Sequence, residues 1–99
     1  MIERRSSRRV AYRAEAHVDG PHASRTPTRV ADLGADGAYM DSPATLPVGH
    51  RAVLSFTLID RELTAEIEVI YSVPGRGMGV RFINLSPAER SLIKSIVEA

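Results

Sequence analysis

Apolar and polar positions alternate along two long stretches of this chain. Alternation of this kind is the pattern of a β-strand with one buried face. In residues 10–19 the apolar positions are Val10, Tyr12, Ala14, Ala16 and Val18. In residues 62–73 they are Leu63, Ala65, Ile67, Val69 and Tyr71. We therefore predict that both stretches are half-buried strands.

Turn residues divide the remaining chain into shorter strand-like runs. These runs cover residues 26–33, 38–40, 51–59 and 78–83. Gly34, Asp36 and Gly37 predict a tight turn, and Asp60-Arg61 predicts the turn of a hairpin. Pro27 confines the start of its run to a sheet edge or a bulge, because proline has no N–H to donate.

The pattern changes from strand to helix near the C-terminus. Ser86 is a good N-cap, Pro87 suits the first helical position, and Glu89 completes a capping box. One face of the following segment is apolar, through Leu92, Ile93, Ile96 and Val97. We predict a helix over residues 86–98.

These elements predict an all-β fold with one C-terminal helix. The expected architecture is a small six-stranded antiparallel β-barrel over residues 10–83, preceded by a flexible arginine-rich arm at residues 1–9. A chain of 99 residues fits one domain, so residues 1–99 are predicted to form a single unit.

Composition narrows the class of protein. The apolar content of 43% and charged content of 25% are typical of soluble globular proteins, and no apolar run is long enough to cross a membrane. Cysteine is absent, so neither disulfides nor thiolate metal sites are expected. We expect a cytoplasmic protein that does not associate with membranes.

Positive charge is concentrated at the N-terminus. Five arginines and one glutamate give residues 1–13 a net charge of +4; since the whole chain carries +1, the rest sums to −3. The planar guanidinium of arginine can form two hydrogen bonds to a phosphate or to a guanine edge, and it can also stack on a base. The arm is therefore a candidate clamp for an anionic, planar ligand.

Enzyme chemistry finds little support in this sequence. His17, His22 and His50 are not spaced as metal ligands, and no nucleophile elbow or P-loop is present. Glu66 and Glu68 share one strand face, where solvated charge is the expected role. We expect no catalytic residue, no metal and no cofactor.

Two motifs give the chain a resemblance to the PilZ domain family, which are receptor modules for cyclic di-GMP. The family motif R-x-x-x-R, placed just before the first strand, is matched by Arg5 to Arg9, with an overlapping match from Arg4 to Arg8. The second motif, D/N-x-S-x-x-G, is matched by residues 32–37, with glycine in place of the serine. Residues 77–82 and the terminal helix resemble the end of the family's fold.

The resemblance implies a ligand and a set of contacts. Arg5 and Arg9 would contact phosphate and guanine, and Arg4 would support them and favour an intercalated ligand dimer. Asp32 would accept hydrogen bonds from guanine N1–H and N2–H. Gly37 would permit a positive-φ turn or a close backbone approach.

Gly34 is the position where the chain departs from the family pattern. Serine would supply a hydroxyl, whereas glycine keeps only its backbone N–H. Loss of one such hydrogen bond costs about 1–3 kcal/mol, or roughly ten- to a hundredfold in affinity. We expect weakened binding, unless Ser6, Ser7 or Asp36 compensates.

Three functions stay open at this point. The first is a cyclic di-GMP receptor that signals by ordering its arm, through a protein partner or by self-association. The second is a degenerate PilZ domain that acts as a protein-interaction adaptor without ligand. The third is nucleic-acid binding, which the negative charge of the barrel and its few aromatics disfavour, because some of those aromatics should lie in the core.

Overall fold

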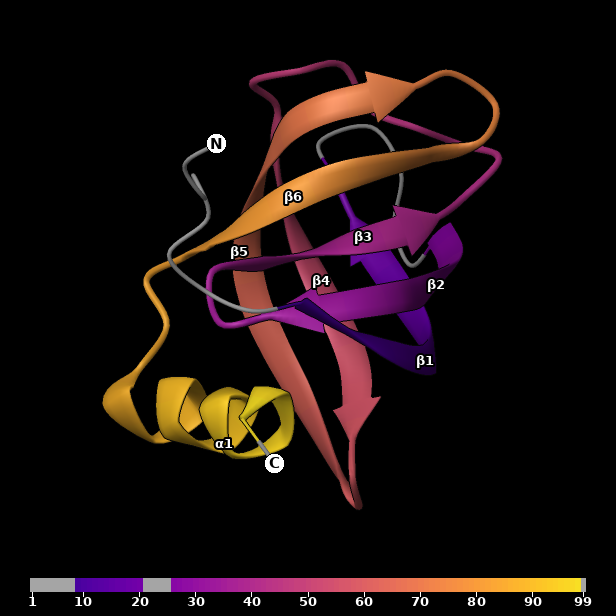
Figure 1. Cartoon of the computed structure of the whole chain (residues 1–99). Coiled ribbons are helices and arrows are strands. Elements are labelled where there is room, and N and C mark those ends of the chain that lie inside the picture. Colours follow the sequence, from indigo (N-terminus) through magenta and orange to yellow (C-terminus); the bar gives the residue numbers. More distant parts are fainter. Residues whose placement is uncertain (1–8, 21–25, 99) are drawn as a thin grey trace, which may run out of the picture.

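Six antiparallel strands close into a barrel in the computed structural model, which describes residues 9–20 and 26–98 (Figure 1). The order around the barrel is β1-β2-β3-β6-β5-β4, and β4 pairs with β1 to close it. The strands are β1 (Arg9–Asp19), β2 (Thr26–Gly34), β3 (Gly37–Asp41), β4 (Arg51–Leu58), β5 (Arg61–Val73) and β6 (Gly77–Ile83). The predicted fold class is confirmed, while residues 1–8 of the predicted arm lie outside the described residues.

Alternation places one set of side chains from every strand inside the barrel. The largest fully buried residues of the strands are Val30, Leu33, Met40, Leu54, Phe56, Leu58, Ile67, Val69, Met78 and Val80. Burying an aliphatic or aromatic side chain of this size stabilises a fold by about 1.5–3 kcal/mol. The barrel is therefore held by its own filled interior.

The C-terminal helix α1 (Pro87–Val97) packs against one end of the barrel (Figure 1). Ile93 and Val97 are 0% and 2% exposed and belong to the same core cluster as the strand residues. The predicted capping box is confirmed: Ser86 Oγ accepts from Glu89 N–H at 3.1 Å, and Glu89 Oε1 accepts from Ser86 N–H at 3.0 Å. No helix in the described ranges is long and apolar enough to span a membrane.

A bulge in β5 corrects one sequence expectation. The register of β5 against β6 shifts between Val69 and Tyr71. A bulge adds one unpaired residue and so reverses the face on which later side chains lie. Tyr71, predicted to continue the buried side, is instead 45% exposed, and Ile70 is 43% exposed.

Two turns also differ slightly from their predicted positions. The β4–β5 hairpin turns at Ile59-Asp60, one residue earlier than expected, and β5 begins at Arg61. The β2–β3 connection consists of residues 35–36 only, because Gly34 and Gly37 are themselves strand residues. Pro27 pairs with β1. The pairing of β2 with β3 begins later in β2, so the side of Pro27 that faces away from β1 is a sheet edge, as predicted.

Candidate ligand-binding site

An ion pair joins two of the predicted site residues. Arg9 is the first residue of β1, and its Nη1 lies 2.8 Å from Oδ1 of Asp32 in β2. The two side chains are 21% and 38% exposed, so both remain partly open to solvent. The pair places a guanidinium and a carboxylate side by side on the outside of the barrel.

The two predicted glycines flank the β2–β3 connection, Gly34 at the end of β2 and Gly37 at the start of β3. Gly34 is buried and faces Arg9 in the β1–β2 register, whereas Gly37 faces Arg81 in the β3–β6 register. A Cβ added at Gly37 would overlap the Val80 carbonyl oxygen. Close backbone approach is therefore why Gly37 lacks a side chain. The alternative, a positive φ, is wrong: in the described ranges only two glycines have one, Gly49 and Gly75.

The registers of five strands align into one continuous row across the outer face of the barrel. Ala11 faces Asp32, Asp32 faces Tyr39, Tyr39 faces Gly79, and Gly79 faces Tyr71. We call these five residues the central row. Neighbouring strands lie about 4.8 Å apart, so the row brings Asp32 beside an aromatic side chain.

Tyr39 and Tyr71 form a stacked pair on this face. Their ring centroids are 6.1 Å apart and the ring planes differ by 23°. A Cβ at Gly79 would overlap the Tyr71 ring, and one at Gly77 would overlap Tyr39, so the rings lie over glycine backbone of β6. The expectation that some of the aromatics lie in the core is met by Phe56, which is 1% exposed, whereas Tyr71 is 45% exposed.

A second ion pair borders the central row. Arg81 Nε in β6 donates to Glu68 Oε1 in β5 at 2.8 Å, and the Arg81 side chain is 54% exposed. Sequence reasoning placed Arg81 in the last strand but did not assign it to the site. The available signal was its position two residues after Gly79, which puts both on the outer face.

The acidic residues and histidines of the described ranges do not assemble a metal site. Glu68 is paired with Arg81, and Glu66 Oε1 accepts from Asn84 Nδ2 at 2.8 Å. Throughout residues 9–20 and 26–98, no group of three or more histidine, cysteine or acidic side chains could hold a metal ion. His22, Arg4 and Arg5 fall outside the described residues.

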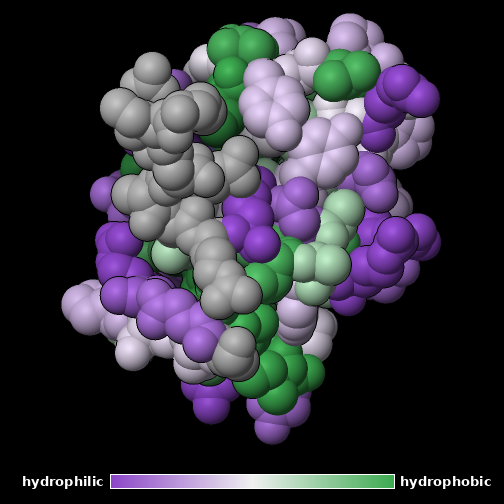
Figure 2. All heavy atoms as spheres, in the orientation of Figure 1, coloured by the Kyte–Doolittle hydropathy of each residue, from purple (hydrophilic) through white to green (hydrophobic). Residues whose placement is uncertain are grey.

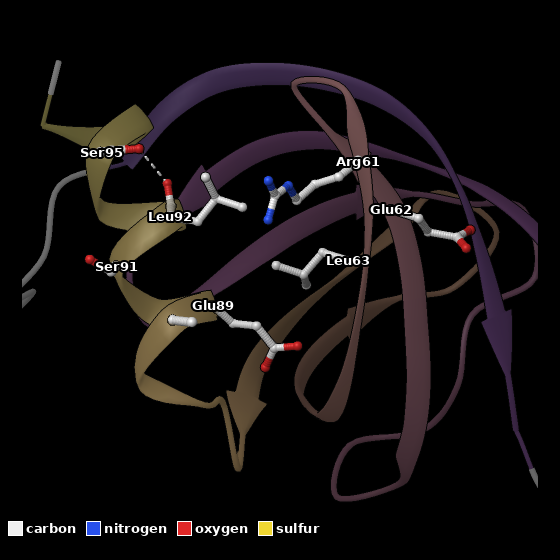
Figure 3. Close-up of a pocket in the computed structure, with 8 residues that line it drawn as sticks. Arg61, Glu62, Leu63, Glu89, Ser91, Leu92 and Ser95 are labelled. Atoms are coloured by element: carbon white, nitrogen blue, oxygen red, sulfur yellow. Dashed lines mark hydrogen bonds between the residues drawn. The ribbon is translucent and has the colours of Figure 1, made fainter.

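A separate hollow of about 500 Å³ lies between α1 and the start of β5 (Figure 3). Arg61 and Leu63 extend into it from the strand, and Leu92 extends from the helix. Glu89 also lines it but belongs to the capping box. None of the predicted site residues that the structure describes lines this hollow, so we interpret it as the seam along which the helix packs.

The fold is shared with solved structures of bacterial proteins. The inhibitor of motility MotI/DgrA from Bacillus subtilis superimposes with a TM-score of 0.85 at 15% identity, over 98% of this chain and 51% of the other. YcgR from Escherichia coli in complex with c-di-GMP gives 0.82 at 19% identity, over 98% and 46%. This chain thus spans about half the length of each.

An isolated domain gives the same result. The PilZ domain of Escherichia coli YcgR, solved with c-di-GMP, has a TM-score of 0.76 at 18% identity, over 97% of this chain and 90% of the other. No curated protein sequence matches the chain. The PilZ domain family matches residues 3–99, almost the whole sequence. This chain is a member of the PilZ domain family.

Proposed function

We propose that this protein is a receptor for cyclic di-GMP. PilZ domains are receptor modules rather than enzymes, and two similar structures, both of YcgR, were solved with this ligand. The observation that carries the proposal is the 2.8 Å ion pair between Arg9 and Asp32, because it unites one residue from each family motif. A nucleotide with two guanines and two phosphates needs both of these side-chain types.

Each side chain has a defined task in this proposal. Asp32 accepts hydrogen bonds from guanine N1–H and N2–H, donors that only guanine presents together on that edge. Arg9 and Arg5 bind phosphate and the O6/N7 edge of guanine, the pairing that arginine also makes in DNA recognition. Arg4 supports them and favours an intercalated dimer of the ligand.

The two glycines shape the backbone beside the ligand. Gly34, opposite Arg9, offers a backbone N–H where the family pattern has a serine hydroxyl. Gly37 keeps β3 close to β6, which holds the β2–β3 connection against the barrel. Asp36 O accepts from Phe82 N–H at 2.8 Å and fixes the same connection.

The output of the receptor is a change in the arm. Binding orders the arm that precedes β1 over the ligand, because its arginines gain phosphate and guanine partners. The ordered arm then alters contacts with a protein partner or with a second copy of the chain. No covalent bond is made or broken when the ligand binds.

Isothermal titration with cyclic di-GMP tests the proposal. We expect saturable binding by the wild type, and a loss of roughly tenfold or more in Arg5→Ala and Arg9→Ala. Arg13→Ala is the matched control, since Arg13 is an exposed arginine of β1 outside both motifs. Equal affinity in all four proteins would show that the site is wrong.

The adaptor function makes a different prediction. Gly34 favours it, because the missing hydroxyl removes one ligand contact. In that case titration of the folded protein with cyclic di-GMP would give no heat of binding at any attainable concentration. A titration with single-stranded DNA tests the third function, because nucleic-acid binding would weaken steeply when the salt concentration is raised.

A further inference from the structure

We propose that Tyr39 and Tyr71 form a stacking platform for a guanine base of the bound nucleotide. This inference rests on the proposed function and adds two residues from strands that neither motif includes. It identifies the aromatic pair as the part of the site that binds the face of the base, while Arg9 and Asp32 bind its edge.

The platform directly adjoins the ion pair. Tyr39 faces Asp32 in the β2–β3 register, and both belong to the central row. Tyr71 extends over the same face from β5. Its ring lies over Gly79 and the Tyr39 ring lies over Gly77, so no β6 side chain at these two positions covers the rings. A base whose edge is held by Asp32 therefore has an aromatic surface beside it.

The pair is also open on the side that a ligand needs. Tyr71 is 45% exposed, so part of its side chain is accessible to a ligand. Tyr39 lines a hollow of about 540 Å³ together with Asp41, Val73, Gly75 and Arg76, so its surroundings leave room for a planar group.

The bulge in β5 is what creates the platform. Without the register shift between Val69 and Tyr71, residue 71 would lie on the same face as Val69, which is buried in the core. Bulges often redirect a side chain beside a functional site. A structural role alone, covering the glycines of β6, is the competing explanation and predicts no effect on ligand binding.

Substitution of the rings separates these explanations. Tyr71→Leu and Tyr39→Leu keep apolar cover over the glycines but remove the aromatic face. We expect each to weaken cyclic di-GMP binding roughly tenfold or more, since base–aromatic stacking is typically responsible for that much. Tyr71→Phe keeps the ring and is expected to bind like the wild type.

Tyrosine fluorescence tests the contact in a protein whose platform is intact. The chain has three tyrosines and no tryptophan, so Tyr12→Phe leaves only the platform tyrosines to emit. Tyr12 serves the β4–β5 hairpin, where its hydroxyl accepts from Ile59 N–H at 3.0 Å. We expect cyclic di-GMP to quench the tyrosine fluorescence of the Tyr12→Phe variant. The Tyr39→Leu/Tyr71→Leu double variant, which retains Tyr12 alone, controls for absorption by the ligand.

The outcomes distinguish the two proposals. If the wild type binds cyclic di-GMP but the leucine variants bind equally well, or Tyr12→Phe is not quenched, the platform is overturned and the receptor function stands. If the wild type does not bind, the receptor function fails and the platform fails with it. Should a leucine variant misfold, the quenching of Tyr12→Phe still decides.

Discussion

The Arg9 guanidinium lies 2.8 Å from the Asp32 carboxylate, although the two residues are 23 positions apart in the chain. The contact links the start of β1 to the end of β2 on the outer face of the barrel. Because both side chains are partly exposed, the pair contributes only about 0–1 kcal/mol to folding. Its importance is therefore expected in ligand binding rather than in stability.

Asp32→Ala is predicted to weaken cyclic di-GMP binding by roughly tenfold or more, since a hydrogen-bonded carboxylate acceptor is lost. Discrimination against cyclic di-AMP should fall in parallel, because adenine lacks the N1–H and N2–H donors that Asp32 accepts. Titration calorimetry with both nucleotides measures the two effects.

A double-mutant cycle provides the control for this substitution. In urea unfolding, Arg9→Ala and Asp32→Ala should couple by less than about 1 kcal/mol. Unchanged affinity for both nucleotides in a folded Asp32→Ala protein would exclude Asp32 from the site.

Gly37→Ala is predicted to destabilise the barrel by about 1–3 kcal/mol or more, as overpacking does. The added Cβ would overlap the Val80 carbonyl oxygen and push β3 away from β6. Gly20→Ala is the matched control, because its Cβ would meet only Leu46 Cδ1 at 3.9 Å. Thermal unfolding of the two variants compares them, and similar melting temperatures would contradict the argument.

The sequence predicted local features well, because their causes are local. The capping box of Ser86 and Glu89 needs only the residues of one turn, and it forms as expected. Alternation likewise places Leu63 to Val69 correctly in β5, since each side chain depends on its position in one strand. Six strands and a helix follow from such patterns.

Features that depend on pairing between distant strands could not be predicted from the sequence alone. The bulge that exposes Tyr71 is defined by the register of β5 against β6, which no residue of β5 encodes by itself. Gly37 was assigned two possible reasons, and only its contact with Val80 of β6 decides between them. The family resemblance assigns Arg9 and Asp32 to one ligand site but predicts no contact between them, and the pairing of β1 with β2 brings the two side chains together.

Ile59→Asn is predicted to stabilise the protein by about 0.5–1 kcal/mol. Ile59 has a φ of 62°, a left-handed conformation that costs a β-branched residue about 1–2 kcal/mol and that asparagine tolerates better. Its side chain is 64% exposed, so little burial is lost. Figure 2 shows hydrophobic surface at the lower end of the molecule, where the β4–β5 hairpin turns in Figure 1.

Chemical denaturation measures this effect, with Val48→Asn as the control. Val48 is similarly exposed, at 62%, but has no positive φ, so its substitution should leave stability almost unchanged. A loss of stability in Ile59→Asn would show that the isoleucine side chain makes a contact worth more than the backbone strain.

Gly34→Ser is predicted to strengthen cyclic di-GMP binding by roughly tenfold, because it restores the hydroxyl of the family motif as a hydrogen-bonding group. Gly34 faces Arg9 in the register, so the new hydroxyl would stand beside the ion pair. Gly34→Ala separates this effect from the loss of glycine flexibility, since alanine restricts the backbone without supplying a hydroxyl. Calorimetry of the three proteins should give the highest affinity to serine alone. If serine and alanine behave alike, the hydroxyl has no role here, and the departure at Gly34 does not limit affinity.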